Sequence, residues 1–357
     1  MRSPVLFRGR PLLYHRSHYY PDEAVHALEF IHDAMQNSER THDTKTRILL
    51  VPNGSYRICG KIMAQAYSKL CPEVIRRIFI IGRTSHFLPY TCALSQMDYL
   101  NSPLGKLPVD RENESLPMLA NNPSTSQNCV HQANAKLIKT GDFTYLDFPK
   151  DTKEQSVEMQ LPFISKVMEN RKGYFKVVPV YIGTLAHEQL TVVARRFRDY
   201  VKEPENAFIF SASLCHWGDI YGFNAQIPDA PTVLDSIKVF DERAIAAMRE
   251  LRFRPFDEFL LDTKAKVLDN QIIALLLFMV RQLLNANLHA LISMDEEKVV
   301  NQMRKLARFK LMGQAWSYPD VTPADSCISY VSATVELDEE KYIPEEPPEP
   351  NPLNKLC

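Results

Sequence analysis

Short apolar runs alternate with amphipathic segments along most of this sequence. Buried strands are predicted where apolar residues stand together, at 47–51, 77–82, 175–182 and 207–210. Helices are predicted where apolar residues recur at helical spacing, at 21–36, 60–70, 156–168, 187–202, 237–251 and 269–285. Apolar and polar residues alternate at 328–337, which is typical of an edge strand.

Strands that alternate with helices predict an α/β fold with a central, mostly parallel sheet flanked by helices. Two stretches do not fit its core. Residues 112–135 are polar and rich in Asn and Ser, which indicates a surface insertion. Residues 338–357 are acidic and Pro-rich, so we expect a disordered or extended tail. No repeat or domain boundary is visible, and a single domain over 1–337 is the simplest interpretation.

Composition narrows the class of protein. Apolar residues make up 45% of the chain, enough for a large core, and the net charge of -1 argues against nucleic acid as the main partner. The longest apolar run, at 272–280, is much shorter than the roughly 20 residues of a membrane-spanning helix, so no span is expected. The N-terminus has no unbroken apolar segment, and we read no secretory signal there.

The cysteines indicate a reducing compartment. There are seven of them, at irregular spacing and without a CxxC pair, which disfavours a disulfide framework or a structural zinc site. Reduced thiols fit the cytoplasm, with the nucleus as an alternative.

Chemistry in such a fold collects in the loops at the carboxyl ends of the strands. Four polar segments qualify, at 52–60, 82–89, 154–162 and 211–218. The metal-type ligands that they and the 264–271 region offer are Cys59, His86, Glu154, Glu158, Cys215, His216 and Asp269. Their spacing does not require a metal, because a single loop histidine more often bonds to the backbone.

A Cys–His nucleophile is a weaker interpretation. Cys215 and His216 are sequence neighbours, and neighbours in a strand point to opposite faces. The chain contains no Walker A loop, GxSxG, HExxH or GxGxxG motif. No catalytic residue is therefore assigned from the residues alone.

The segments resemble, in order, those of the Memo family, named for a mediator of cell motility. CHWG at 215–218 is the most specific match. Weaker matches span about residues 10 to 337: VPNGSYRICG, RRIFIIG with SH and CALS, EQSVEMQLPF, VVPVYIG and DSCISYVSA. The resemblance implies a fold like that of class III extradiol dioxygenases. It also implies a pocket that is associated with copper or iron and with phosphotyrosine-bearing receptor peptides.

Most departures from the family pattern fall in that pocket. Polar or apolar side chains stand where the family has stronger ligands: Asn53, Ser85, Gln155 and Gln160 for His, Ser213 for Asp, Val267 for Cys and Asn270 for His. His18 aligns loosely with a family Trp, whereas His86, Glu158 and His216 remain. Neutral amides and hydroxyls keep hydrogen bonding but lose metal affinity, so no copper or iron is expected.

Arg57 and Arg83 stand in the first two pocket loops, where the family's matching positions are not usually basic. We expect both to raise the positive potential of the pocket and to favour phosphate or another anion. The expected pocket comprises His18, Asn53, Arg57, Arg83, Ser85, His86, Gln155, Glu158, Gln160, Ser213, Cys215, His216 and Val267.

The sequence thus predicts a signalling or scaffold protein that binds a protein partner, a phosphotyrosine peptide or a small anion. Because its metal-ligand set is degenerate, we expect it not to be an enzyme. The resemblance adds a role in cell motility or cytoskeletal signalling. The alternative is a copper- or iron-dependent oxidoreductase that uses His86, Glu158 and His216. A third hypothesis is a structural paralogue whose pocket binds nothing.

Overall fold

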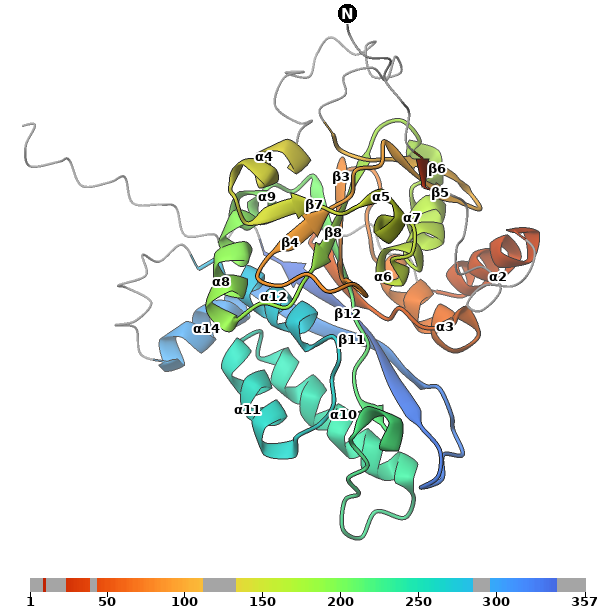
Figure 1. Ribbon diagram of the computed structural model, residues 1–357, viewed down its shortest axis with the longest axis vertical. Coiled ribbons are helices and arrows are strands. Elements are labelled where there is room, and N and C mark those ends of the chain that lie inside the picture. The colour runs from red at the N-terminus through yellow and green to blue at the C-terminus, as the bar shows by residue number, and fades with distance from the viewer. Residues whose placement is uncertain (1–8, 11–23, 39–43, 112–132, 285–295, 339–357) are drawn as a thin grey trace, which may run out of the picture.

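The computed structural model describes residues 9–10, 24–38, 44–111, 133–284 and 296–338 (Figure 1). His18, residues 112–132 of the expected insertion and the tail from 339 onward lie outside the described residues.

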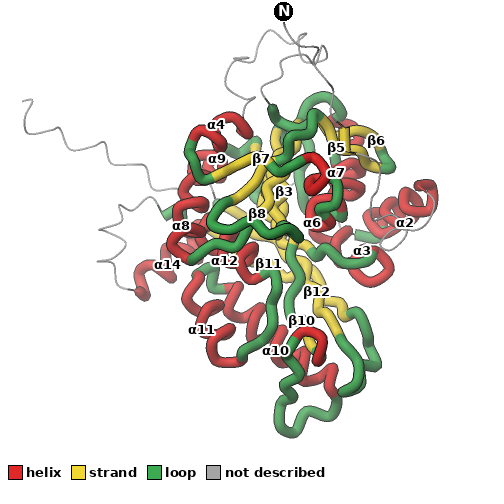
Figure 2. Tube along the Cα trace, in the orientation of Figure 1, coloured by secondary structure: helices red, strands yellow, loops and turns green. Residues whose placement is uncertain are grey.

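A nine-stranded sheet runs through the described part of the chain (Figure 2). Its four central strands are parallel, in the order β2 (Thr46–Val51), β9 (Asn206–Ser211), β3 (Arg77–Arg83) and β8 (Lys176–Ile182). Antiparallel pairing begins on either side, where β12 (Cys327–Leu337) joins β2 and β4 (Cys92–Leu94) joins β8. The outer strands are β7 (Phe143–Tyr145), β10 (His216–Trp217) and β11 (Ala307–Trp316).

Helices cover both faces of this sheet (Figure 1). One face carries α4 (Ala133–Lys139), α8 (His187–Arg196), α9 (Arg198–Lys202), α10 (Val233–Arg249), α11 (Phe253–Thr263), α12 (Asn270–Arg281) and α14 (Glu296–Leu306). The other carries α2 (Ala24–Gln36), α3 (Tyr56–Tyr67), α6 (Gln155–Glu158) and α7 (Leu161–Val167). The smaller elements are β1 (Gly9–Arg10), β5 (Tyr99–Ser102), β6 (Gly105–Pro108), α5 (Phe148–Asp151), η2 (Glu169–Arg171) and η3 (Asp219–Tyr221). The predicted α/β architecture with a mostly parallel centre is confirmed.

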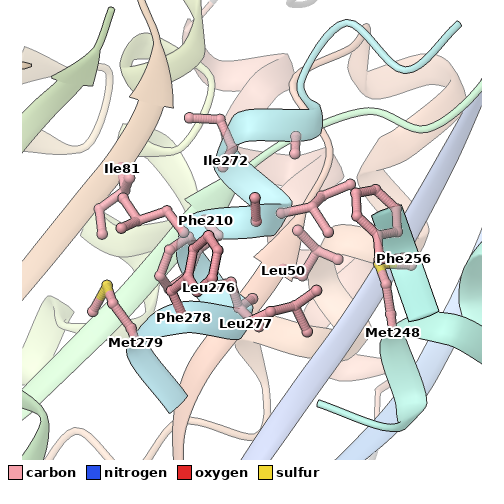
Figure 3. Packing of buried hydrophobic residues seen from close by; sticks show 14 of the residues in the cluster. Leu50, Ile81, Phe210, Met248, Phe256, Ile272, Leu276, Leu277, Phe278 and Met279 are labelled. Atoms are coloured by element: carbon pink, nitrogen blue, oxygen red, sulfur yellow. The ribbon is translucent and has the colours of Figure 1, made fainter. Parts of the chain in front are cut away.

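Alternate side chains of each central strand enter two separate hydrophobic clusters, because successive residues of a strand point to opposite faces. In β2, Ile48 and Leu50 pack on the α12 side, whereas Leu49 and Val51 pack on the α3 side. Figure 3 shows Leu50 of the sheet, Leu276 of α12 and Met248 of α10 in one packed cluster. The apolar run at 272–280 is thus a buried helix, as predicted, and no described helix is long and apolar enough to cross a membrane.

Two predictions about the elements were wrong, one about the place of a strand in the sheet and one about the extent of a helix. The strand at 328–337 is not an edge strand, because β12 lies between β2 and β11, and its small polar residues Ser329, Ser332 and Thr334 are buried. The helix expected over 156–168 is two helices, and Pro162 stands in the first turn of the second, where its missing N–H needs no partner.

The expected insertion also extends less far than its composition indicated. Residues 133–135 belong to α4 and are buried, instead of lying in a surface loop. Asp110 fixes the point where this helix begins, because its Oδ2 accepts a hydrogen bond from the backbone N–H of Ala133 at 3.3 Å.

Candidate functional site

A cavity of about 320 Å³ lies where β2, β3 and β9 end. The three strands are neighbours and run parallel, so the loops that follow them meet at one edge of the sheet. The lining residues are Asn53, Ser55, Arg83, Ser85, Glu154, Gln155, Ser156, Ser213, His216, Asp269, Ile328 and Tyr330. Those that the sequence assigned to a pocket are Asn53, Arg83, Ser85, Gln155, Ser213 and His216.

Asp269, just before α12, organises the charged side of the cavity. Its Oδ2 accepts a hydrogen bond from the backbone N–H of Ser213 at 2.9 Å and a long one from Nδ2 of Asn53 at 3.5 Å. Its Oδ1 accepts from Nε of Arg83 at 3.1 Å. Ser213 Oγ also donates to Oδ1 of Asn53 at 2.8 Å. The carboxylate is therefore held by three donors from three different loops.

Arg83, the last residue of β3, is the cation of this network. Its side chain is 47% exposed, whereas that of Asp269 is only 5% exposed. The guanidinium has five N–H donors, and only Nε is used by Asp269. Within the described part of the chain, neither Nη of Arg83 has a hydrogen-bond partner. Arg83 is thus fixed at one end and keeps its outer donors available.

His216 contributes a buried imidazole. Its Nδ1 lies 3.0 Å from the carbonyl oxygen of Leu214. Because a carbonyl only accepts hydrogen bonds, Nδ1 carries the proton in this contact. The ring also packs edge-to-face on Tyr221, with centroids 5.1 Å apart. Burial lowers the pKa of His216, and the positive charge of Arg83 acts in the same direction, although the Asp269 carboxylate opposes it. His216 is therefore neutral near pH 7.

Glu154 and Gln155 form another wall of the cavity. Glu154 Oε1 accepts from Oγ1 of Thr84 at 2.5 Å, and the backbone N–H of Ser85 lies 3.0 Å from Oε2. Gln155 Nε2 donates to the backbone carbonyl of Asn53 at 2.8 Å. These contacts fix the loops that follow β2 and β3 against the segment that begins α6.

Ile328 and Tyr330 of β12 form the apolar wall. Neither residue is predicted to lie in the pocket, because the alternation of apolar and polar residues at 328–337 predicts an edge strand. Since β12 runs antiparallel to β2, its beginning lies at the edge where the parallel strands end. Ser55 and Ser156 were also not assigned, although both lie in loops that the sequence had singled out.

Several expected pocket residues do not line the cavity. Arg57 is exposed on α3 and does not line the cavity, and His86 also lies outside the lining. The remaining described ones are buried and do not line the cavity: Glu158, Gln160, Cys215 and Val267.

For Gln160, Cys215 and Val267, contacts within the protein give the physical reason. Gln160 donates to the carbonyl of Pro52 at 3.0 Å and to Oγ of Ser211 at 2.9 Å, which ties α7 to the sheet. Cys215 and Val267 form an isolated antiparallel bridge. Burial raises the pKa of the Cys215 thiol, so this thiol is not an activated nucleophile.

The residues do not fit a transition-metal site of the kind that the resemblance implies. Among the described residues there is no group of three or more His, Cys, Asp and Glu side chains that could hold a metal ion. Of the three ligands of the oxidoreductase hypothesis, only His216 lines the cavity. Asp269, the carboxylate whose charge acts on His216, is already paired with the guanidinium of Arg83. That pairing supplies the positive charge that a metal would bring.

Comparisons with known proteins agree with the order of segments. A family model described as Memo-like protein matches residues 14–333. The chain is 29% identical to protein MEMO1 of Homo sapiens and of Mus musculus over 214 residues, which are 60% of this chain and 65% of each relative. It is 28% identical to protein MEMO1 of Xenopus laevis over 228 residues, 64% of this chain and 70% of the relative. The chain thus spans less than two thirds of the length of the human and mouse relatives.

Among solved structures, an uncharacterized protein, JW3007 of Escherichia coli K12, aligns over 81% of this chain and 99% of its own, with a TM-score of 0.40 and 11% identity. The family model, in contrast, covers nearly all of the chain, including every loop that lines the cavity. The chain belongs to the Memo-like protein family.

Proposed function

We propose that this protein is a non-catalytic member of its family, a signalling or scaffold protein whose cavity binds an anionic group of a protein partner. The observation that carries the proposal is Arg83, whose Nε is fixed by Asp269 while its outer donors have no partner in the described residues. A phosphotyrosine-bearing peptide is the candidate ligand, in the cytoplasm and in a pathway of cell motility, by resemblance to the family.

The chemistry of the cavity supports an anion. Guanidinium groups bind phosphate and carboxylate oxygens through short, charge-assisted hydrogen bonds. The two lining carboxylates already accept donors from the protein, Glu154 from Thr84 and Ser85, and Asp269 from Ser213 and Arg83. The apolar wall suits the ring of a phosphorylated aromatic side chain.

The absence of catalysis is proposed because the described residues of the cavity lack an activated nucleophile and a converging set of metal ligands. A nucleophile needs an activated side chain, and the Cys215 thiol has a raised pKa because it is buried. A metal-assisted reaction needs converging ligands, and His86 and Glu158 do not line the cavity that contains His216. Among the described residues, no contact favours the oxidoreductase hypothesis over binding.

Titration of a phosphotyrosine peptide into wild-type protein, Arg83→Met and Arg57→Met tests the proposal. Loss of the charge-assisted bonds in Arg83→Met should weaken binding about 10- to 100-fold. Arg57→Met is the matched control, because Arg57 is exposed outside the cavity, and its affinity should equal that of the wild type.

The double variant Arg83→Met/Asp269→Asn guards against loss of folding, since it removes both charges of the ion pair together. It should unfold cooperatively and bind as weakly as Arg83→Met. No saturable binding to the wild type, or equal losses in the Arg83 and Arg57 variants, would overturn the proposal.

A further inference from the structure

The unused atom of His216 is the second polar group that the cavity offers. Because Nδ1 carries the proton that bonds to Leu214, the neutral ring has its lone pair on Nε2. Nε2 has no hydrogen-bond partner among the described residues, and it is not among their fully buried unpaired atoms. Since His216 lines the cavity, this acceptor is accessible to a ligand.

Arg83 and His216 therefore present complementary groups in one small space. Arg83 offers donors with a positive charge, and His216 offers an acceptor without charge. The two side chains are close enough for the charge of Arg83 to act on the imidazole. A bare anion satisfies only Arg83 and leaves the His216 acceptor without a partner, which costs free energy once water is displaced.

We propose that the cavity recognises its ligand at two points, with the Nη groups of Arg83 binding an oxyanion and Nε2 of His216 accepting a hydrogen bond from a donor on the same group. This inference rests on the proposed function and deepens it. The ligand class is an oxyanion that carries its own O–H, for which a singly protonated phosphate monoester is the simplest example. A sulfate ester has the same shape and a single negative charge but no O–H at neutral or mildly acidic pH.

Binding of phenyl phosphate and phenyl sulfate near pH 6 separates the contribution of His216 from that of Arg83. At that pH about half of the phosphate monoester carries one proton, because its second pKa is about 6. The wild type should prefer phenyl phosphate by about 3- to 10-fold, the range expected for one neutral hydrogen bond. Arg83→Met should weaken binding of both compounds.

His216→Asn is the informative variant. Its side-chain amide can still donate to the carbonyl of Leu214, but it is too short to present an acceptor where Nε2 stands. It should keep the affinity for phenyl sulfate and lose the preference for phenyl phosphate. His216→Phe, which lacks both nitrogens, serves as a second variant with the same expected loss of preference.

Equal binding of the two compounds to the wild type, or a preference that survives in both His216 variants, overturns the two-point recognition and leaves anion binding intact. Failure of the wild type to bind either compound or the phosphotyrosine peptide overturns the proposed function and this inference with it. An O–H donor next to an oxyanion also occurs in hydroxy acids, and titration with mandelate distinguishes that source from a phosphate ester.

Discussion

Asp241 makes the stability of this protein depend on pH. It lies on α10, is 1% exposed, and accepts hydrogen bonds from Oγ of Ser329 at 2.7 Å and from Nε1 of Trp316 at 2.9 Å. It therefore joins α10 to β11 and β12. Burial raises its pKa from an ordinary value of 3.8 to about 7, although both hydrogen bonds favour the charged form.

A carboxyl group with a raised pKa in the folded state stabilises the fold at low pH, where the folded protein holds a proton that the unfolded chain releases more readily. This stabilisation is complete below the unfolded pKa and is lost as the pH rises through the folded pKa. For a folded pKa of about 7, the loss between about pH 5 and about pH 8 is about 2–3 kcal/mol of unfolding free energy. Asp241→Asn removes the titration and should remove this part of the pH dependence.

Urea unfolding of wild type and Asp241→Asn at both pH values measures the effect. His216, whose lowered pKa contributes with the opposite sign, is present in both proteins and cancels in the difference. Asp320→Asn, which changes an exposed carboxylate, is the control and should keep the wild-type dependence. If Asp241→Asn loses as much free energy as the wild type over this range, Asp241 does not carry the effect.

Two further predictions concern the fold. Arg47→Met should lower the free energy of unfolding by about 3–5 kcal/mol, because the buried guanidinium donates to three backbone carbonyls that would lose their partner. A loss of less than about 1 kcal/mol, measured by urea unfolding, would refute this. Replacing residues 112–132 by a short Gly–Ser linker should leave the melting temperature within a few degrees, since Asp110 and Ala133 are joined by a hydrogen bond; loss of cooperative melting would contradict it.

The parallel centre of the sheet was predictable because its signal is local. Strands buried on both faces read as continuous apolar runs, and β2, β3, β8 and β9 all lie within a residue or so of the predicted ranges. The edges of the sheet were harder to predict, because β11 and β12 are half polar and their positions depend on pairing with each other. No local pattern distinguishes a strand at the edge of a sheet from one that a later partner covers.

The candidate site was predictable only in part for the same reason. Asn53, Arg83 and Ser213 follow parallel strands, and the rule that such loops converge brings them together. The Asp269–Arg83 pair joins residues 186 positions apart, and the sequence gives no signal that they meet. Arg57 and Arg83 looked alike as basic loop residues, and only the direction of α3 separates the exposed one from the one in the cavity.

The ion pair between Arg83 and Asp269 lies in the pocket that, by resemblance to the family, would hold metal ligands. The resemblance implies an Asp at position 213, but Ser213 stands there and its backbone N–H donates to the Asp269 carboxylate instead. The negative charge in the pocket is thus that of Asp269, from a different loop, and the guanidinium of Arg83 neutralises it. This arrangement is suited to binding an anion and poorly suited to binding a second cation.

The most direct test of this account is the affinity for a phosphotyrosine peptide measured with and without a strong metal chelator, on wild-type protein and on Arg83→Met. The account predicts that wild-type affinity is unchanged by chelation and that Arg83→Met weakens it about 10- to 100-fold under both conditions. Binding that disappears on chelation, returns with added copper or iron, and does not depend on Arg83 would contradict it.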